Sequence, residues 1–127
     1  MSNEPLPDEV RRFVLTSIPS VPYLEALLLL RSNAQRDWDT RGVARRLYVP
    51  EGKAIELLRA LQEAGVAARG AGESWRYAPH DDNLRAMIDS VDHFYATRLV
   101  EITALIHTHV DRRAVQFADA FRFKKEP

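Results

Sequence analysis

The stretch TRGVARRLYVPEGKAIELLRALQEAGVAARGAGESWRYAP, residues 40–79, decides the fold. Apolar side chains repeat every three or four residues on both sides of Pro50, which is the spacing of one face of a helix. Thr40 is a suitable N-cap, Pro50 suits the first turn of a helix, and Gly65 suits the left-handed residue after a helix end. The stretch therefore predicts two helices joined by a tight turn.

A β-hairpin is predicted directly after Gly65. The segments VAAR and SWRYA flank GAG, whose glycines favour a tight turn. Alternation along the second segment places Trp75 and Tyr77 on one face and Arg76 on the other. We expect both aromatic rings to pack in the core rather than to stack on a nucleobase, because no further exposed aromatic accompanies them.

Two further helices are predicted before residue 40. Pro7, followed by two acidic residues, suits the start of a short amphipathic helix that ends before Pro19. Ser20 is a plausible N-cap for a second helix, which runs to Asn33. Apolar residues surround much of this second helix, so we expect it to be the central buried helix of the domain.

After residue 80 the sequence predicts one long helix, capped by Asp81 or Asp82 and free of internal Gly and Pro. Its apolar stripe runs from residue 84 to 106, about 35 Å at 1.5 Å per residue. Because a small domain cannot cover so long a stripe, we expect part of it to form a subunit interface. The predicted interface residues are Leu84, Ile88, Val91, Tyr95, Arg98, Leu99, Ile102 and Ile106. Arg98 is expected to pair with Glu101 or Asp92 across that interface. A last short helix is predicted after residue 110.

The composition is that of one globular domain, with 127 residues of which 46% are hydrophobic and 28% charged. Its 18 basic and 18 acidic residues cancel, so nothing attracts the whole chain to polyanions. Cysteine is absent, which excludes disulfides and thiol chemistry and accords with a reducing cytoplasm. No membrane partner and no signal peptide are expected, because the longest apolar run, LEALLLL, falls far below the roughly 20 residues that span a bilayer.

Residues 22–79 resemble the winged helix-turn-helix domain of bacterial transcription regulators of the MarR or PadR type. The resemblance rests on TRGVARRLYVPEGKAIELLRALQEAGVAA and SWRYAP. It implies a mainly α fold with a two-stranded wing, flanked by an N-terminal tail and helix over 1–21 and by dimerising C-terminal helices over 80–127. In such domains the second helix of the pair enters the major groove of DNA, and the wing reaches the flanking groove or backbone.

Carried over by position, the resemblance implies nine DNA-binding residues. Lys53, Arg59 and Gln62 would read base edges, because Arg and Lys donate to guanine and Gln can pair with adenine. The backbone contacts would come from Thr40, Arg41, Arg45, Arg46, Arg69 and Arg76.

The charges of the chain support a local rather than a global attraction to DNA. Nine basic and six acidic residues lie between residues 31 and 80, so this segment carries +3 and the rest of the chain −3. Against this, Glu51 and Glu56 stand on the predicted reading face and repel phosphate.

These patterns predict a cytoplasmic, sequence-specific DNA-binding transcriptional regulator that acts as a homodimer, with double-stranded DNA and a second copy of itself as partners. The alternative is a winged-helix protein-protein interaction module without DNA binding, which would tolerate the two acids. A cavity between dimer helices could also hold a small apolar effector, as in the regulators that the chain resembles.

No enzyme, cofactor or metal site is expected. His107 and His109 diverge on a helix, and no Cys completes a ligand set. The neighbouring aspartates at 81–82, and those at 89 and 92, are explained by helix capping and by helix surface positions rather than by acid-base chemistry. The sequence contains no nucleophile elbow, glycine-rich phosphate loop or metalloprotease motif.

Overall fold

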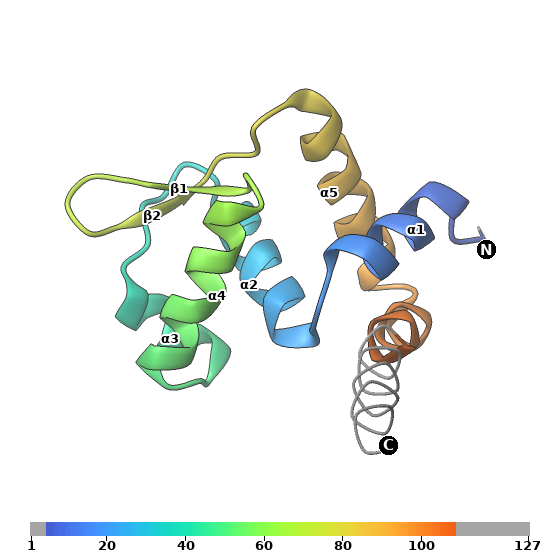
Figure 1. The fold of residues 1–127 in the computed structure, drawn as a ribbon, viewed down its shortest axis with the longest axis horizontal. Coiled ribbons are helices and arrows are strands. Elements are labelled where there is room, and N and C mark those ends of the chain that lie inside the picture. Colours follow the sequence, from blue (N-terminus) through green and yellow to red (C-terminus); the bar gives the residue numbers. More distant parts are fainter. Residues whose placement is uncertain (1–4, 109–127) are drawn as a thin grey trace, which may run out of the picture.

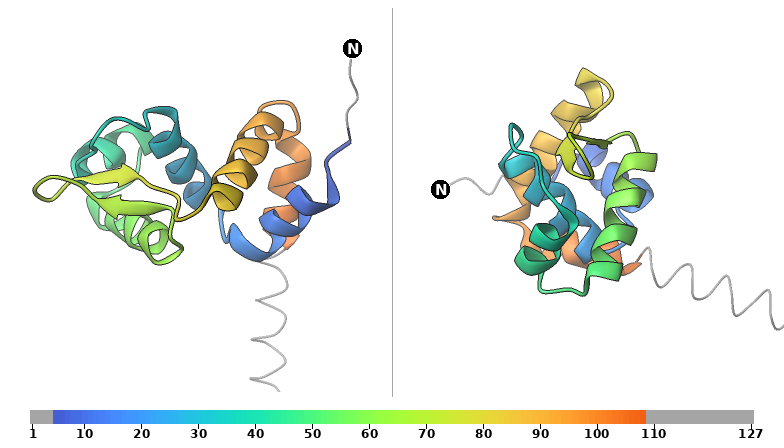
Figure 2. Two further views of the ribbon diagram at one scale, coloured as in Figure 1. Left: turned by 90° about the horizontal axis from the view of Figure 1, so that it is seen from above. Right: turned by 90° about the vertical axis from the view of Figure 1, so that its left-hand side faces the viewer.

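The computed structural model describes residues 5–108, and this part of the chain is mainly helical with a small two-stranded antiparallel sheet (Figure 1). The elements are α1 (Asp8–Ser17), α2 (Val21–Ser32), α3 (Thr40–Leu47), α4 (Glu51–Glu63), β1 (Ala67–Arg69), β2 (Trp75–Tyr77), α5 (Asp82–Tyr95) and a further helix at Leu99–Thr108. Figure 2 shows α3, α4 and the β1–β2 hairpin at one end, and α1, α5 and the Leu99–Thr108 helix at the other.

Side-chain caps explain where three of the helices, α2, α3 and α5, begin. The Ser20 hydroxyl accepts a hydrogen bond from the Tyr23 amide at 3.2 Å, as predicted, and the Asp81 carboxylate caps α5 through the Leu84 amide at 2.7 Å. The prediction that Thr40 caps α3 was wrong. Asp39 is the N-cap, and its carboxylate accepts from the Gly42 amide at 2.6 Å, so α3 begins one residue earlier than expected.

The turn between α3 and α4 contains an unusual backbone conformation. Tyr48 ends α3 with a φ of 58°, in the left-handed region that a bulky residue rarely adopts, and its side chain is 94% exposed. Pro50 is in extended conformation immediately before α4 and provides no side-chain cap. Gly65 follows α4 with a φ of 78°, as predicted, and a Cβ at this position would collide with the His80 ring.

The hairpin pairs β1 with β2 in the register Ala67 to Tyr77 and Arg69 to Trp75. Trp75 and Tyr77 are buried and the intervening Arg76 is exposed, which confirms the predicted alternation. A third segment extends this pairing, because the backbone groups of Trp38 and Trp75 exchange two hydrogen bonds of 2.7 Å. No local pattern in the sequence indicates this bridge.

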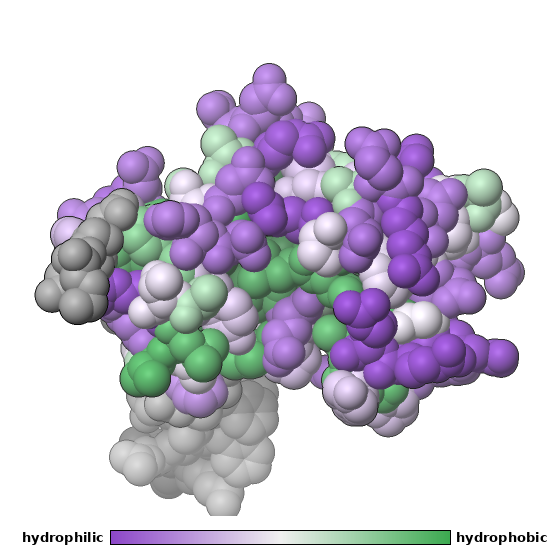
Figure 3. All heavy atoms as spheres, turned by 180° about the vertical axis from the view of Figure 1, so that it is seen from behind, coloured by the Kyte–Doolittle hydropathy of each residue, from purple (hydrophilic) through white to green (hydrophobic). Residues whose placement is uncertain are grey.

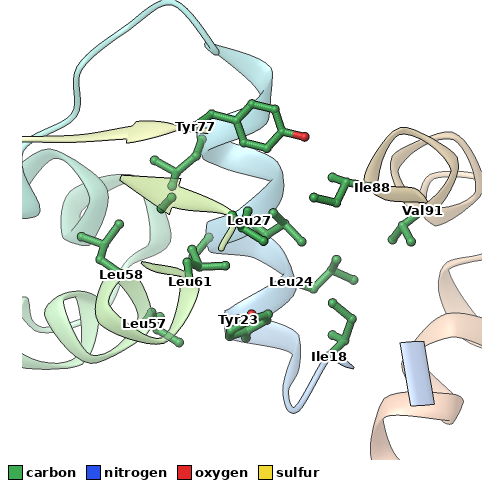
Figure 4. Close-up of a cluster of buried hydrophobic side chains, with 14 of the residues drawn as sticks. Ile18, Tyr23, Leu24, Leu27, Leu57, Leu58, Leu61, Tyr77, Ile88 and Val91 are labelled. Carbon is green, nitrogen blue, oxygen red and sulfur yellow. The ribbon is translucent and has the colours of Figure 1, made fainter. Parts of the chain in front are cut away.

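Helix α2 is the centre of the core, as predicted. Leu24, Leu27 and Leu30 are at most 1% exposed, so the helix contributes side chains to both ends of the molecule. Figure 4 shows α2 between α4 and α5. The side chains drawn around α2 are Leu57, Leu58 and Leu61 of α4, Tyr77 of β2, and Ile88 and Val91 of α5.

The prediction of one uninterrupted helix from residue 82 to beyond residue 106 was wrong. Helix α5 ends at Tyr95, and the chain turns at residues 96–98 before the Leu99–Thr108 helix begins. Neither Gly nor Pro marks this break. Its physical reason is burial, since the turn folds the second helix back so that Ile102 and Ile106 are 0% exposed. The Thr97 hydroxyl, which donates to the Phe94 carbonyl at 3.4 Å, provides a local alternative to helical hydrogen bonding.

The prediction of a subunit interface was also wrong for four of its eight residues. Ile88, Val91, Ile102 and Ile106 are each 0% exposed within a single chain and leave no surface for a second subunit. The acids predicted to pair with Arg98 across the interface are engaged within the chain. Asp92 accepts from Arg31 and Glu101 accepts from Arg11, both at 3.0 Å.

No single helix among residues 5–108 is both long and apolar enough to cross a membrane. Helices α1 and α2 reach that length and apolar content only together, and they are bent by 112° at their junction.

Candidate nucleic-acid interface

Four of the nine predicted DNA-binding residues line one surface hollow of about 630 Å³, called the interface hollow below. It lies where the start of α3, the exposed face of α4 and the hairpin turn meet, at one end of the molecule (Figure 1). The four residues are Thr40, Arg41, Arg59 and Arg69. The other lining residues are Asp39, Glu51, Ile55, Ala71, Glu73 and Ser74. Residues that are 29 positions apart in the chain, from Thr40 to Arg69, therefore share one concave surface.

The exposed face of α4 presents the residues that were predicted to read bases. Lys53, Arg59 and Gln62 are exposed, and Glu56 lies among them at the same helical spacing. Lys53 Nζ is 4.0 Å from Glu56 Oε2, at the outer limit of an ion pair. Arg59 has no hydrogen bond or ion pair within residues 5–108, so its five donors face solvent.

Glu51, which should repel phosphate, is paired with a cation in this structure. Arg41 Nε lies 3.0 Å from Glu51 Oε1, and the two side chains are 76% and 59% exposed. A pair this exposed contributes only about 0–1 kcal/mol to stability. Arg41 is therefore free to exchange the carboxylate for a stronger anion at little cost.

Besides Arg41, two further predicted backbone contacts have partners within the chain. Arg76 Nε lies 3.3 Å from Asp37 Oδ1, and both side chains are partly exposed. The Thr40 hydroxyl accepts a hydrogen bond from Trp75 Nε1 at 3.3 Å, which fixes the start of α3 against β2. The hydroxyl hydrogen of Thr40 is still available to an acceptor in the interface hollow.

Arginine side chains stack on both tryptophans of the chain. The Arg69 guanidinium carbon lies 4.3 Å from the centre of the Trp75 ring. On the neighbouring segment, Arg36 and Arg46 lie 4.0 Å and 5.7 Å from the centre of the Trp38 ring. Contacts of this kind stabilise an exposed cation by about 0.5–1 kcal/mol and hold a long side chain in one place. Arg36 and Trp38 were not among the predicted site residues. The local feature that could have indicated their contact is the separation of two positions between the arginine and the tryptophan.

The charges of this end of the molecule do not cancel locally. Within the part of the chain that the structure describes, the basic side chains of residues 36–76 that lack a carboxylate partner are Arg36, Arg45, Arg46, Arg59 and Arg69. All five are exposed. Figure 3, which shows the molecule from behind, is mostly hydrophilic over this end and more hydrophobic toward the middle and the opposite end. The candidate surface is therefore a polar surface rich in unpaired arginine.

Tyr77 packs the hairpin against α5 at the opposite end of the molecule, and Arg31 joins α2 to the same helix. Arg31 on α2 donates to Asp89 at 2.9 Å and to Asp92 at 3.0 Å, and the hydrogen bond to Asp89 raises the pKa of Arg31. The Tyr77 side chain packs between α2 and α5 (Figure 4), and its hydroxyl is buried without a hydrogen-bond partner among the described residues. Burial raises the pKa of this phenol, and the nearby Asp89 carboxylate raises it further.

Three of the four predicted interface residues that are not buried, Tyr95, Arg98 and Leu99, lie around the turn after α5, whereas Leu84 lies in the first turn of α5. Leu99 is 51% exposed, while Leu84, Tyr95 and Arg98 are partly buried. Val100, which was not predicted, is 83% exposed and lines a shallow hollow of about 420 Å³ together with residues 96–99 and 101. Leu99 and Val100 are the large aliphatic residues that are exposed among residues 5–108.

Among residues 5–108, no three His, Cys, Asp or Glu side chains lie close enough to hold a metal ion. His109 and the short helix predicted after residue 110 lie outside the described residues.

No protein-family model matches the chain, and comparisons with curated proteins and with solved structures also find no match. The case for any function therefore depends on the geometry and chemistry described above.

Proposed function

We propose that residues 22–79 form a winged helix-turn-helix domain and that the protein is a sequence-specific DNA-binding transcriptional regulator of the MarR or PadR type. The observation that carries this proposal is the interface hollow, in which Arg41, Arg59 and Arg69 come together from α3, α4 and the hairpin. Helix, tight turn, helix and hairpin follow in the order of that domain class. Packing does not account for the three arginines, because all of them are exposed.

In this proposal α4 lies in the major groove. Arg59 lies on its exposed face and donates to guanine, while Gln62, about one turn after it, and Lys53, nearly two turns before it, contact neighbouring bases. Arg41, Arg45, Arg46, Arg69 and Arg76 bind backbone phosphates and set the register of the domain on the duplex. Glu51 does not prevent this arrangement, because its charge is offset by Arg41 at 3.0 Å.

We further propose that the regulator is a cytoplasmic homodimer. Leu99 and Val100, with Tyr95 and Arg98 nearby in the sequence, would supply the described part of the contact, and Leu84 in the first turn of α5 is the remaining candidate. A two-fold axis would place the two α4 helices about 34 Å apart and require a near-palindromic target.

Selection from a random duplex library tests the proposal. The wild-type protein is expected to enrich one near-palindromic sequence, and Arg59→Ala is expected to relax the selection at the bases that Arg59 reads. Arg76→Ala should weaken binding to all sequences alike. Arg12→Ala is a matched control, because Arg12 is an exposed arginine on α1, at the other end of the molecule. Enrichment of no sequence by a folded sample would contradict the proposal.

The second candidate function is a winged-helix module that binds another protein. It is favoured by the exposure of Val100 and Leu99 and by the carboxylates of Glu51, Glu56 and Glu73 on the opposite end. The two functions differ in which variant matters. Val100→Asp would abolish partner binding in this case, whereas Arg59→Ala would have no effect.

A further inference from the structure

Two cations share one aromatic ring at the edge of the sheet. Arg36, in the segment before α3, has its guanidinium carbon 4.0 Å from the centre of the Trp38 ring. Arg46, in the last turn of α3, has its guanidinium carbon 5.7 Å from the same centre. The Trp38 side chain is 1% exposed, whereas both arginines are exposed.

Folding does not explain why both cations are gathered here. Two like charges held against one ring repel each other, and cation-π contacts at exposed positions stabilise a fold only weakly. Neither arginine has a carboxylate partner within residues 5–108. Asp37 is adjacent to Arg36 in sequence, yet it pairs with Arg76 at 3.3 Å. The local excess of positive charge is therefore left for an external anion.

Stacking on Trp38 prepares these guanidinium groups for such an anion. A guanidinium that contacts an aromatic ring through its face keeps its N–H donors at its edge, where they fit phosphate oxygens in pairs. Because stacking already restricts the long side chains, less conformational entropy is lost when a phosphate binds.

The position of this pair relates it to the interface hollow. Trp38 and Trp75 are bridged by two backbone hydrogen bonds of 2.7 Å, so their rings belong to neighbouring segments. Trp75 carries Arg69 at 4.3 Å and donates to the hydroxyl of Thr40, and both of these residues line the hollow. The contact of Arg69 with Trp75 is thus matched by the contact of Arg36 with Trp38 on the neighbouring segment.

We propose that Arg36 and Arg46, held by Trp38, form a binding site for backbone phosphates of duplex DNA. This inference rests on the proposed function and extends it. Arg36 becomes a DNA-binding residue, and the protein contacts DNA phosphates beyond those at the interface hollow. The site contributes affinity and register rather than sequence preference, since phosphates carry no base identity.

The first test is the salt dependence of duplex binding for Arg36→Ala and Arg46→Ala. Each variant is expected to lower the magnitude of the slope of log affinity against log salt by about 0.9, and to weaken specific and random duplexes alike by roughly three- to tenfold. Arg12→Ala, which removes an exposed arginine from α1, should change neither quantity. Wild-type slope and affinity in both folded variants would overturn the inference and leave the proposed function intact.

The second test reads Trp38 directly. The chain contains two tryptophans, so a ¹⁵N spectrum holds two indole N–H signals, which Trp75→Phe assigns. Inorganic phosphate, added at constant ionic strength without DNA, is expected to shift the Trp38 signal in the wild type and not in the Arg36→Ala, Arg46→Ala double variant. A shift at Trp75 alone would contradict the site.

The two tests separate this inference from the proposed function. If the Trp38 signal responds to phosphate but the protein binds no duplex, the anion site is supported. The assignment of duplex DNA as its ligand and the proposed function are then both contradicted. Stronger binding to RNA than to duplex DNA, with the same dependence on Arg36, would overturn the duplex assignment.

Discussion

The two ends of the molecule differ in what packing explains. At the end formed by α1, α5 and the Leu99–Thr108 helix, most of the apolar side chains predicted to meet a second subunit are buried within one chain. At the end formed by α3, α4 and the hairpin, the predicted DNA-binding residues are exposed, apart from the partly buried Thr40. Packing therefore accounts for the apolar pattern at the first end, whereas the arginines of the second end have at most exposed ion pairs or contacts with tryptophan rings.

The largest effect is expected from truncating a residue that was predicted at an interface and is buried in the chain. Ile102→Ala should lower the free energy of unfolding by about 2–5 kcal/mol, because it leaves a cavity in the core. Urea denaturation at several protein concentrations measures it. A loss of this size that does not vary with protein concentration supports burial within one chain. If the loss of unfolding free energy became smaller as the protein is diluted, Ile102 would lie in a subunit interface.

A change at the opposite end should spare stability and affect recognition. Arg59→Ala is expected to remove about 1–3 kcal/mol of discrimination between the preferred base and the others, while the free energy of unfolding stays within about 0.5 kcal/mol of wild type. Competition binding with single-base variants of the selected duplex gives the first quantity and urea denaturation the second. If Arg59→Ala unfolds the protein, the arginine is structural and the contrast between the two ends fails.

The exposed pair after α5 should govern association without affecting folding. Val100 is 83% exposed in the single chain and lies in the proposed dimer contact. Val100→Asp is expected to convert the homodimer to a monomer, because dimerisation would then bury a charge. Light scattering coupled to size exclusion measures the mass. The control is Ala104→Asp, on the same helix and also exposed. A dimer that persists in Val100→Asp would show that the contact lies elsewhere.

A smaller gain in stability is expected at the turn between α3 and α4. Tyr48 has a φ of 58°, a conformation that costs a side chain with a Cβ about 1–2 kcal/mol and that Asn tolerates better. Tyr48→Asn should therefore raise the free energy of unfolding by up to about 1 kcal/mol. A lower stability in this variant would mean that the exposed ring makes contacts that the conformation does not suggest.

The smallest effect is expected from removing an acid that is already paired. Glu51→Gln should strengthen duplex binding by roughly two- to fivefold, because Arg41 no longer has to leave a carboxylate to reach phosphate. The gain should disappear at high salt, where exposed charges are screened. Weaker binding would show that Glu51 itself accepts from a base.

The sequence predicted the features of the fold that local chemistry controls. Ser20, Asp81 and Gly65 each act through the backbone of neighbouring residues, so their roles could be predicted without the fold. The break after Tyr95 could not, because it depends on the burial of Ile102 among residues distant in the sequence.

The candidate site was predictable by residue type but not by pairing. Periodicity placed Arg59 and Lys53 on the exposed face of α4. The Arg41 pair with Glu51 and the bridge between Trp38 and Trp75 join residues 10 and 37 positions apart, and no local pattern indicates them. The proposed role of Arg36 depends on its 4.0 Å contact with the Trp38 ring and on the bridge that places Trp38 beside Trp75, and only the structure shows both.

The most direct test of DNA binding is the affinity of the wild-type protein for duplex DNA across a salt series, measured by fluorescence anisotropy. With Arg41, Arg45, Arg46, Arg69 and Arg76 proposed to bind backbone phosphates, log affinity is expected to fall linearly against log salt with a slope of about −4 to −5. Absence of binding at low salt by a folded sample would contradict the account, and would leave α3, α4 and the hairpin as a scaffold for protein contacts.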